Sequence, residues 1–197
     1  MLYLVIFDVL FNLKLLMMNH LKKGLFLIII YFMYNGINSA QSINKDIDNR
    51  KIALEIINKA DFCALITLDN EGIPEARMMQ TLPTDHDFVI WLATKPNTRK
   101  VEQIKQNSKV GVYYTGNESS AYVYIKGNAT LVNDILLKKK YWKEGWESFY
   151  PDMETDMILI KISPLTAQIV SYTHGIVSEE LNWSAPIINI KSIENEN

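Results

Sequence analysis

The sequence predicts a mainly β protein, most simply a small antiparallel barrel with helices packed against its outside. Three observations lead to this prediction: the expected strands outnumber the expected helices, consecutive strands are joined by short turns, and several strands are apolar on both faces. Residues 62–69, FCALITLD, place apolar side chains on both sides of one strand. An antiparallel strand of this kind needs a cover on each face. We expect the second cover to be helices or another copy of the chain, and we favour a homodimer.

Hydrophobic spacing and turn residues place each element in chain order. In residues 48–60, Ile52, Ile56 and Ala60 recur four apart behind Asp48, which predicts an amphipathic helix with an N-cap. Strands are expected where apolar runs lie between turn signals such as Asn-Glu-Gly at 70–72. After residue 178 the sequence is polar and weakly patterned, so no element is expected there. The expected strands are 62–69, 73–81, 88–93, 109–115, 121–132, 157–163 and 166–173, and two further helices are expected at 98–107 and 134–147.

The first forty residues have the composition of a secretory signal peptide. The apolar run GLFLIIIYFMY at 24–34 follows two lysines and precedes a small-residue stretch that ends at Ala40. This order of basic, apolar and small residues is typical of export signals, and translation from Met17 or Met18 would give it a normal basic region. We therefore expect a periplasmic or secreted protein after cleavage near Ala40. An uncleaved membrane anchor is the alternative, and a segment without signal function would leave the protein in the cytoplasm.

Composition argues against several classes of function. The chain has 197 residues, of which 48% are hydrophobic and 11% aromatic, and this is the composition of a globular protein. A net charge of −2 argues against nucleic acid as the main partner. One cysteine and three scattered histidines argue against a disulfide and against a metal centre. Since GxSxG, P-loop, GxGxxG and HExxH motifs are all absent, the sequence points to binding rather than to a catalytic side-chain set.

The start of the expected helix at 98–107 is the first candidate site. Thr98 is followed by Arg99 and Lys100, although cations at a helix N-terminus oppose the helix dipole at about 0.3–1 kcal/mol each. The free N–H groups of the first turn, the Thr98 hydroxyl and both cations together would hold a phosphate. In the alternative interpretation, both cationic side chains point into solvent.

Arg77 is the second candidate, because it lies in the strand sequence Ala-Arg-Met-Met-Gln, where a bare cation needs a partner. Glu75 lies two residues earlier on the same strand face and pairs with Arg77 in one interpretation. In the other interpretation, Arg77 is a second cationic arm on the same phosphate. Met78 and Met79 either fill the core or pack against a planar ring.

Other reactive side chains favour structural roles. Most of the aromatic residues are expected in the core, and Cys63 lies inside an apolar strand as a buried, inert thiol. His86 and His174 are expected in loops. The lysine run 138–140 is expected to form a solvated helix face.

The order and spacing of these elements resemble the pyridoxamine 5′-phosphate oxidase-like split-barrel flavoproteins, most closely their general stress protein branch. The similarity covers roughly residues 50–172. It is carried by ALITLDNEGIPEARMMQT, by FVIWLATKPNTRKVEQIKQNSKVGVYYT, and by AYVYIKGNATLVND with the tryptophan-containing segment and FYPDMETDMILIKISP behind it. The resemblance implies a six-stranded antiparallel split β-barrel with flanking helices at 41–175, followed by a C-terminal tail at 176–197. It also implies a homodimer that binds FMN at the subunit interface.

The resemblance further implies which residues hold the flavin. The arginine of the RxM-type strand contacts the flavin phosphate, and the residues after it line the edge of the isoalloxazine ring. The end of the next strand and the start of the following helix complete the phosphate site. From the other subunit, the strand AYVYIKG and the tryptophan helix approach the ring. The residues implied are Arg77, Met78, Met79, Gln80, Ala93, Thr94, Thr98, Arg99, Lys100, Tyr122 and either Trp142 or Trp146.

Two departures from the family pattern bear on function. The C-terminal stretch SAPIINIKSIENEN lacks the arginine and histidine with which true oxidases grip substrate phosphate, so vitamin B6 synthesis is not expected. Tyrosines replace polar residues in the strand 121–127. We expect an FMN-dependent oxidoreductase, in which the flavin transfers hydride or electrons. The alternatives are a non-catalytic flavin-binding or stress-related module and a barrel that binds haem or deazaflavin.

Overall fold

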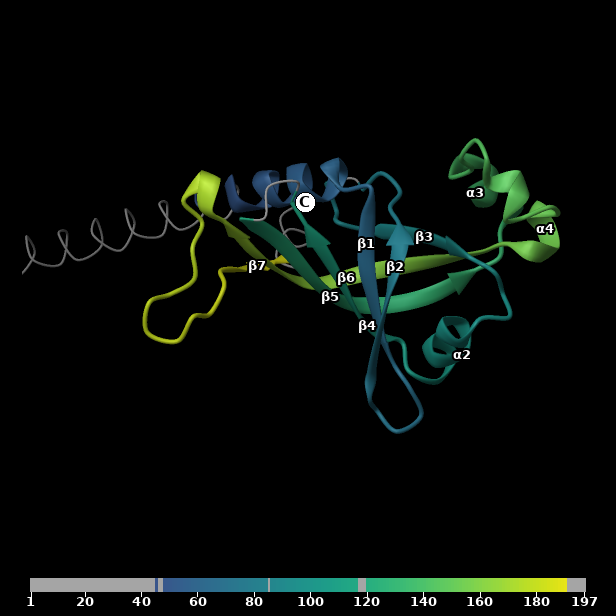
Figure 1. The fold of residues 1–197 in the computed structure, drawn as a ribbon, viewed down its shortest axis with the longest axis horizontal. Helices are drawn as coiled ribbons and strands as arrows, with labels where there is room; N and C mark the ends of the chain where they lie inside the picture. Colours follow the sequence, from purple (N-terminus) through teal and green to yellow (C-terminus); the bar gives the residue numbers. More distant parts are fainter. Residues whose placement is uncertain (1–44, 46–47, 85, 117–119, 191–197) are drawn as a thin grey trace, which may run out of the picture. The chain divides into compact units, whose positions relative to one another are not determined.

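The computed structural model describes residue 45 and residues 48–84, 86–116 and 120–190 (Figure 1). The expected signal peptide at 1–40 lies outside these residues, so export and cleavage near Ala40 stay predictions. Within the described part of the chain, no helix combines the length and the apolar character needed to cross a membrane.

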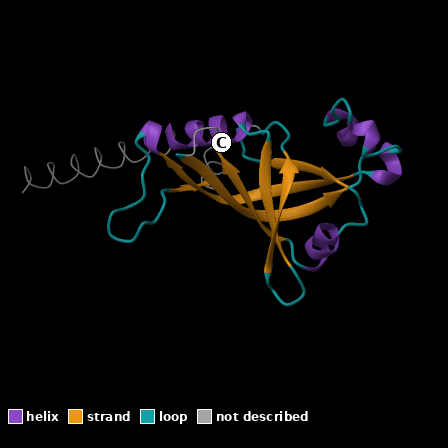
Figure 2. Cartoon of the chain, viewed as in Figure 1, coloured by secondary structure: helices purple, strands orange, loops and turns teal. Residues whose placement is uncertain are grey.

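One antiparallel sheet forms the body of the protein (Figure 2). Six strands follow the order β2-β1-β4-β5-β6-β3 and curl into a half-barrel, and β7 adds to β6. β2 and β3 end the row, which leaves the barrel split between them. The prediction of a mainly β, antiparallel split barrel with flanking helices is confirmed. The strands are β1 (Phe62–Leu68), β2 (Pro74–Gln80), β3 (Ile90–Thr94), β4 (Lys109–Thr115), β5 (Ala121–Val132), β6 (Ile158–Ser171) and β7 (Ile187–Asn189).

Helices flank the sheet (Figure 2). The helix at 48–59 buries Ala53 and Ile57 in the core, which confirms its predicted amphipathic pattern. Helix α2 (Arg99–Gln106) buries Val101 and Ile104. The shorter helical segments are α3 (Ile135–Lys140), η1 (Trp146–Ser148), α4 (Met153–Asp156) and η2 (Tyr172–His174).

The expected helix at 134–147 is wrong beyond its first half. Asp134 caps α3 by accepting a hydrogen bond from the Leu137 N–H at 2.9 Å, but the helix ends at Lys140. Tyr141 is the C-cap of α3, and Gly145, whose φ of +85° is left-handed, precedes η1 and keeps it a separate turn. Lys138 is also buried rather than solvated, because its ammonium group turns inward to backbone carbonyls.

The two late strands expected at 157–163 and 166–173 are one strand, β6. Its pairing with β5 shifts register between Lys126 and Gly127, opposite Pro164, which has no N–H for the ladder. Gly127 is required there because a Cβ atom would lie 2.6 Å from the carbonyl oxygen of Ser163. A β-bulge therefore accommodates the proline without ending the strand.

The segment after residue 178, where no element was expected, contains β7. Ile188 of β7 pairs with Ala167 of β6 and is completely buried in the core. Its sequence signal is a pair of isoleucines between Pro186 and Asn189, too short to be recognised as a strand from its pattern.

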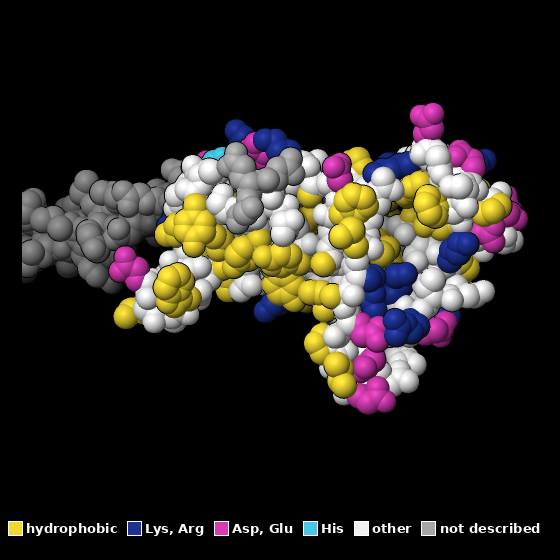
Figure 3. All heavy atoms as spheres, viewed as in Figure 1, with side chains coloured by type: hydrophobic (Ala, Val, Ile, Leu, Met, Phe, Trp, Pro, Cys, Tyr) yellow, Lys and Arg dark blue, Asp and Glu magenta, His cyan; other side chains and the backbone are white. Residues whose placement is uncertain are grey.

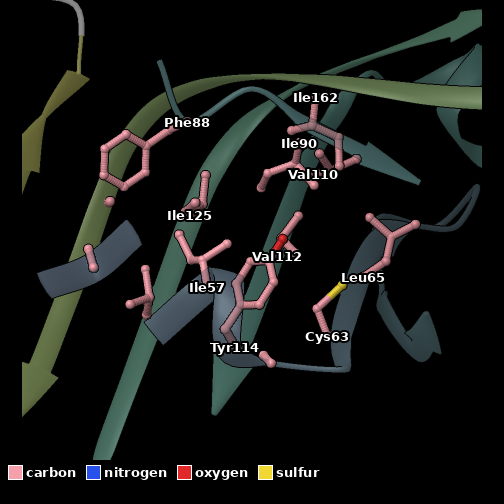
Figure 4. Close-up of a cluster of buried hydrophobic side chains, with 14 of the residues drawn as sticks. Ile57, Cys63, Leu65, Phe88, Ile90, Val110, Val112, Tyr114, Ile125 and Ile162 are labelled. Atoms are coloured by element: carbon pink, nitrogen blue, oxygen red, sulfur yellow. The ribbon is translucent and has the colours of Figure 1, made fainter. Parts of the chain in front are cut away.

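The core has a larger and a smaller part. The larger one joins the helix at 48–59 to inward side chains of the sheet, among them Leu65, Val112 and Ile125 (Figure 4). Cys63 lies in this cluster, which confirms that its thiol is buried, and burial raises the pKa of the thiol to about 12. The smaller part surrounds Trp146 and is rich in aromatic side chains.

The opposite face of the sheet is apolar but exposed. Met78 is 75% exposed and Ile187 61% exposed, and Figure 3 shows a band of hydrophobic side chains across the molecule. Strands that are apolar on both faces were predicted, and one of these faces has no cover among the described residues. A single row of paired residues crosses this outer face: Met78, Ala64, Tyr113, Tyr124, Gln168 and Ile187.

Candidate functional site

Alternation along the edge strand β2 decides which side chains meet. Glu75 and Arg77 point to the same side of the sheet as the buried Met79, whereas Met78 and Gln80 point to the exposed side. The shared face of Glu75 and Arg77 is as the sequence predicts.

The Arg77 guanidinium joins three elements. Its Nη1 donates to Thr67 Oγ1 on β1, and its Nη2 donates to Glu75 Oε2 at 3.0 Å and to Gln103 Oε1 of α2 at 3.0 Å. Thr67 Oγ1 donates to the same Gln103 oxygen, and Gln103 Nε2 donates to Glu75 Oε2 at 3.1 Å. This closed network fixes the guanidinium between β1, β2 and α2.

The start of α2 returns to the end of β3. Thr94 ends β3, and Lys100 Nζ donates to Thr94 Oγ1 at 3.1 Å. Thr98 Oγ1 lies 3.5 Å from Thr94 Oγ1 and donates to the Lys95 carbonyl at 3.0 Å. Thr98 is the N-cap residue of α2, but its side chain makes no cap hydrogen bond. The Val101 N–H donates to the Thr98 carbonyl at 2.9 Å, which leaves the amides of Arg99 and Lys100 as the available donors of the first turn.

Lys100 lies close enough to Arg77 and Arg99 to feel both positive charges, and Figure 3 shows Lys and Arg side chains clustered in this part of the molecule. Burial lowers the pKa of Lys100, and the positive charges of Arg77 and Arg99 lower it further. Burial also lowers the pKa of Arg77; Glu75 opposes this effect and Arg99 adds to it. Among the described residues, Glu75 is the carboxylate that forms ion pairs with these cations, with Arg77 at 3.0 Å and with Arg99 at 3.2 Å. Three cations against one carboxylate leave an excess of two positive charges.

The structure decides between the alternative placements of these side chains. The Arg77–Glu75 ion pair is formed. Arg99 is 84% exposed but turns to Glu75, and the half-buried Lys100 bonds Thr94, so they do not both point into solvent. The residues fit a phosphate group, because cations, hydroxyls and helix N–H groups are the donors that phosphate takes.

The other site residues expected along β2 and β3 lie partly in the core and partly on the outer face. Met79 belongs to the core, where methionine fills space between the strands. Met78 lines a shallow hollow of about 330 Å³ together with Arg77 and Tyr113. Gln80 Oε1 accepts a hydrogen bond from Trp146 Nε1 at 2.8 Å. Ala93 packs against the smaller core cluster.

The expected aromatic residues lie in two separate places within one chain. Tyr122 lies on the outer face of the sheet and stacks on Tyr113, with ring centroids 5.3 Å apart. Trp142 and Trp146 meet edge to face at 6.0 Å in the smaller core cluster. Trp142 Nε1 donates to Glu147 at 3.2 Å. A single protomer thus does not bring Tyr122 together with the two tryptophans.

Thr67 and Gln103 are the two functional-site residues that sequence reasoning missed. Both are buried polar side chains, Thr67 at an inward position of an apolar strand and Gln103 three residues after Lys100 on the same helix. A hydroxyl at an inward strand position is a signal that a polar partner is needed. The identity of that partner depends on the tertiary fold.

The fold and this site define the class: a curled, split antiparallel barrel with a cationic cluster between an edge strand and the following helix. Residues 48–191 match the family described as pyridoxamine 5′-phosphate oxidase like, and the chain belongs to this family. Its relatives place it in the general stress protein branch.

Individual relatives agree with this assignment. General stress protein 26 of Bacillus subtilis (strain 168) is 26% identical over 122 residues, covering 59% of this chain and 84% of that protein. The crystal structure of General Stress Protein 26 from Bacillus anthracis str. Sterne has a TM-score of 0.55 at 26% identity, covering 61% of this chain and 92% of the other. A related structure from Clostridium acetobutylicum has a TM-score of 0.56 at 22% identity, covering 62% and 87%, and shows the fold alone.

Proposed function

We propose that this protein is an FMN-binding flavoprotein and works as an oxidoreductase, with the flavin phosphate held by Arg77, Arg99 and Lys100. One observation carries the proposal: these three cations meet beside a helix start and exceed the carboxylate charge recorded on them by two. A phosphate monoester carries close to two negative charges at neutral pH, which matches this excess. The hydroxyls of Thr94 and Thr98 add neutral donors.

The planar part of the cofactor is assigned to the apolar outer face, on the other side of the edge strand β2 from the cation cluster. Met78 and Tyr113 line the hollow there, Arg77 borders it although its guanidinium points to the other face, and Tyr122 extends the aromatic surface. Membership in the family supports a flavin at this place. When bound, FMN would supply hydride or electron transfer, while this chain would bind and orient it. Met79 keeps a structural role in this proposal.

A homodimer completes the proposal, because the outer face of the sheet exposes apolar side chains. Exposed apolar surface rimmed by polar residues marks interaction sites in soluble proteins. Met78 stands at one end of the row that crosses this face and Ile187 at the other. In the proposed dimer a second copy covers this row, and its Trp142 or Trp146 approaches the flavin.

The oligomeric state is tested by light scattering on a variant of the outer face. Met78→Glu places a charge on the proposed interface and should give a monomer, whereas Met78→Leu should remain a dimer. A monomeric wild-type protein would exclude the proposed arrangement.

Cofactor and activity are tested on the purified protein by its visible spectrum and by turnover with NAD(P)H and an electron acceptor. A flavin spectrum with turnover supports an oxidoreductase, and a flavin spectrum without turnover supports a non-catalytic binding module. A haem spectrum, or a deazaflavin extracted from the protein, would replace FMN. A protein that stays colourless after incubation with excess FMN would contradict flavin binding altogether.

We also propose that the protein is exported, periplasmic or secreted, after cleavage near Ala40. The sequence of residues 1–40 supports this through its basic and apolar segments. The N-terminal sequence of the mature protein from its natural host tests the proposal. A start at residue 41 or close to it is expected, whereas an intact N-terminus in the cytoplasmic fraction would contradict it.

A further inference from the structure

Glu75 bridges two of the cations of the candidate phosphate site. Its two carboxylate oxygens bond different arginines: Oε2 accepts from Arg77 Nη2 at 3.0 Å and Oε1 accepts from Arg99 Nη1 at 3.2 Å. A carboxylate is the anionic side chain that most resembles a phosphate in charge and in hydrogen-bond acceptors. Glu75 therefore uses two of the three cations that a ligand phosphate would use.

Arg77 does not depend on Glu75 for its position. Thr67 Oγ1 accepts from Arg77 Nη1, and Gln103 Oε1 accepts from Arg77 Nη2 at 3.0 Å. Both Thr67 and Gln103 are buried and belong to other elements than Glu75. Removing the Glu75 carboxylate would leave the guanidinium held from β1 and α2.

Glu75 lies at the partly exposed edge of the network: its side chain is 29% exposed, and its ion pair with Arg99, which is 84% exposed, contributes only about 0.2–1 kcal/mol. On leaving, Glu75 also gives up the less exposed ion pair with Arg77 and the hydrogen bond from Gln103 Nε2. A dianion that also reaches Lys100 offers the cations a second negative charge in exchange.

We propose that Glu75 is an internal competitor for the phosphate: its carboxylate bridges Arg77 and Arg99 in the ligand-free protein, and a phosphate monoester binds by displacing it. This inference rests on the proposed phosphate site and states how the affinity of that site is set. It also determines specificity, because a dianionic phosphate monoester displaces the carboxylate better than a monoanion does. A neutral ligand such as riboflavin does not compete with Glu75 for the cations.

The test is the Glu75→Gln variant, which keeps the size of the side chain and removes its charge. FMN, inorganic phosphate and riboflavin are titrated separately against the full chain. We expect Glu75→Gln to bind FMN and inorganic phosphate about fivefold more tightly or better, because two ion pairs no longer oppose binding. Riboflavin affinity should stay unchanged.

Glu102→Gln is the matched control. Glu102 lies on the same helix as Arg99 and Lys100, but its recorded ion pair is with Lys105. This variant measures how much the loss of one nearby negative charge changes ligand affinity when the ion pairs of Arg77 and Arg99 stay intact. Thermal unfolding of both variants establishes that they are folded.

The outcomes separate this inference from the proposed function. Tighter FMN and phosphate binding by Glu75→Gln, beyond the effect of Glu102→Gln, supports displacement. Weaker FMN binding by Glu75→Gln would show that Glu75 positions Arg77 for the ligand. Equal effects of Glu75→Gln and Glu102→Gln would show only the loss of a nearby negative charge. Either result overturns the inference. If the protein does not bind FMN but Glu75→Gln binds inorganic phosphate more tightly, the role of Glu75 as a competitor is supported and the proposed flavin binding is overturned. Failure of every variant to bind either anion would overturn both.

Discussion

Lys138 is buried and Lys100 is half-buried, and burial lowers the pKa of each, but their surroundings differ. Lys138 is 1% exposed, and its ammonium group donates to the carbonyls of Met153 at 3.0 Å and Glu154 at 2.7 Å. The charges of Glu154 and Asp152 raise its pKa again. Its charge is therefore balanced by the protein itself.

Lys100 has the opposite environment. Its recorded hydrogen bond goes to the neutral hydroxyl of Thr94, and the positive charges of Arg77 and Arg99 lower its pKa further. A cation placed among cations costs stability unless an anion joins it, which is typical of binding sites rather than structural ones. The comparison teaches that the charges around a lysine, rather than the extent of its burial, distinguish a structural lysine such as Lys138 from one in a candidate ligand site such as Lys100.

The largest expected effect breaks the site itself. Arg77→Ala combined with Lys100→Ala should weaken FMN binding by about 3–4 kcal/mol, a loss of more than a hundredfold, because two charge-assisted hydrogen bonds to phosphate are removed. Flavin fluorescence titration measures the change. Lys138→Met is the control from the other side of the comparison and should leave FMN affinity unchanged. Full flavin retention in the double variant would remove the proposed phosphate site.

The second largest effect is expected on stability, from replacing the structural lysine Lys138. Lys138→Met should lower the free energy of unfolding by about 1–3 kcal/mol, because two carbonyls lose their charged donor. Lys100→Met should be neutral or slightly stabilising in the absence of ligand, since it relieves repulsion among the cations. Urea unfolding of the ligand-free proteins compares the two. A larger loss for Lys100→Met than for Lys138→Met would reverse our assignment of roles.

A smaller effect tests the residues that hold Arg77. Gln103→Leu removes the α2 partner of the guanidinium and should weaken FMN binding by about 1 kcal/mol. Gln106→Leu, an exposed position on the same helix, is the matched control and should have no effect. Unchanged affinity in both variants would mean that Thr67 alone is sufficient to position Arg77.

The smallest effect is a pH dependence that belongs to Lys100. Its pKa is lowered in the folded protein relative to the ordinary value of 10.5, so between the two values the unfolded chain binds more protons. The free energy of unfolding of the ligand-free protein should therefore rise with pH across this window. FMN affinity should fall across the same window as Lys100 loses its charge. Lys100→Met should abolish the slope in FMN affinity and reduce the slope in stability, to which Lys138 contributes with the same sign. Persistence of the affinity slope in that variant would assign it to another group.

Most of the sheet was predictable from the sequence because alternation and turn residues are local signals. β1, β2, β4 and β5 follow their expected ranges closely. The misses have specific causes: the left-handed Gly145 separates η1 from the expected helix, and a bulge opposite Pro164 lets β6 continue as one strand. β7 depends on pairing with β6 rather than on its own pattern.

The site was predictable in part. The cations of β2 and α2 stand out in sequence because each violates a local rule, Arg77 inside an apolar strand and Arg99 at a helix start. Thr67 and Gln103 violate no such rule strongly, so their contacts with Arg77 emerge only when β1 and α2 are brought together. The inward turn of Lys138 has the same origin, because its carbonyl partners lie on another helical segment.

Comparing the affinities of FMN and riboflavin for the wild-type chain tests the central claim most directly, because the two ligands differ only in the phosphate. We expect FMN to bind at least about a hundredfold more tightly, since the phosphate alone reaches Arg77 and Lys100. Equal affinity for the two ligands would show that the cation cluster does not bind the phosphate and would contradict the account.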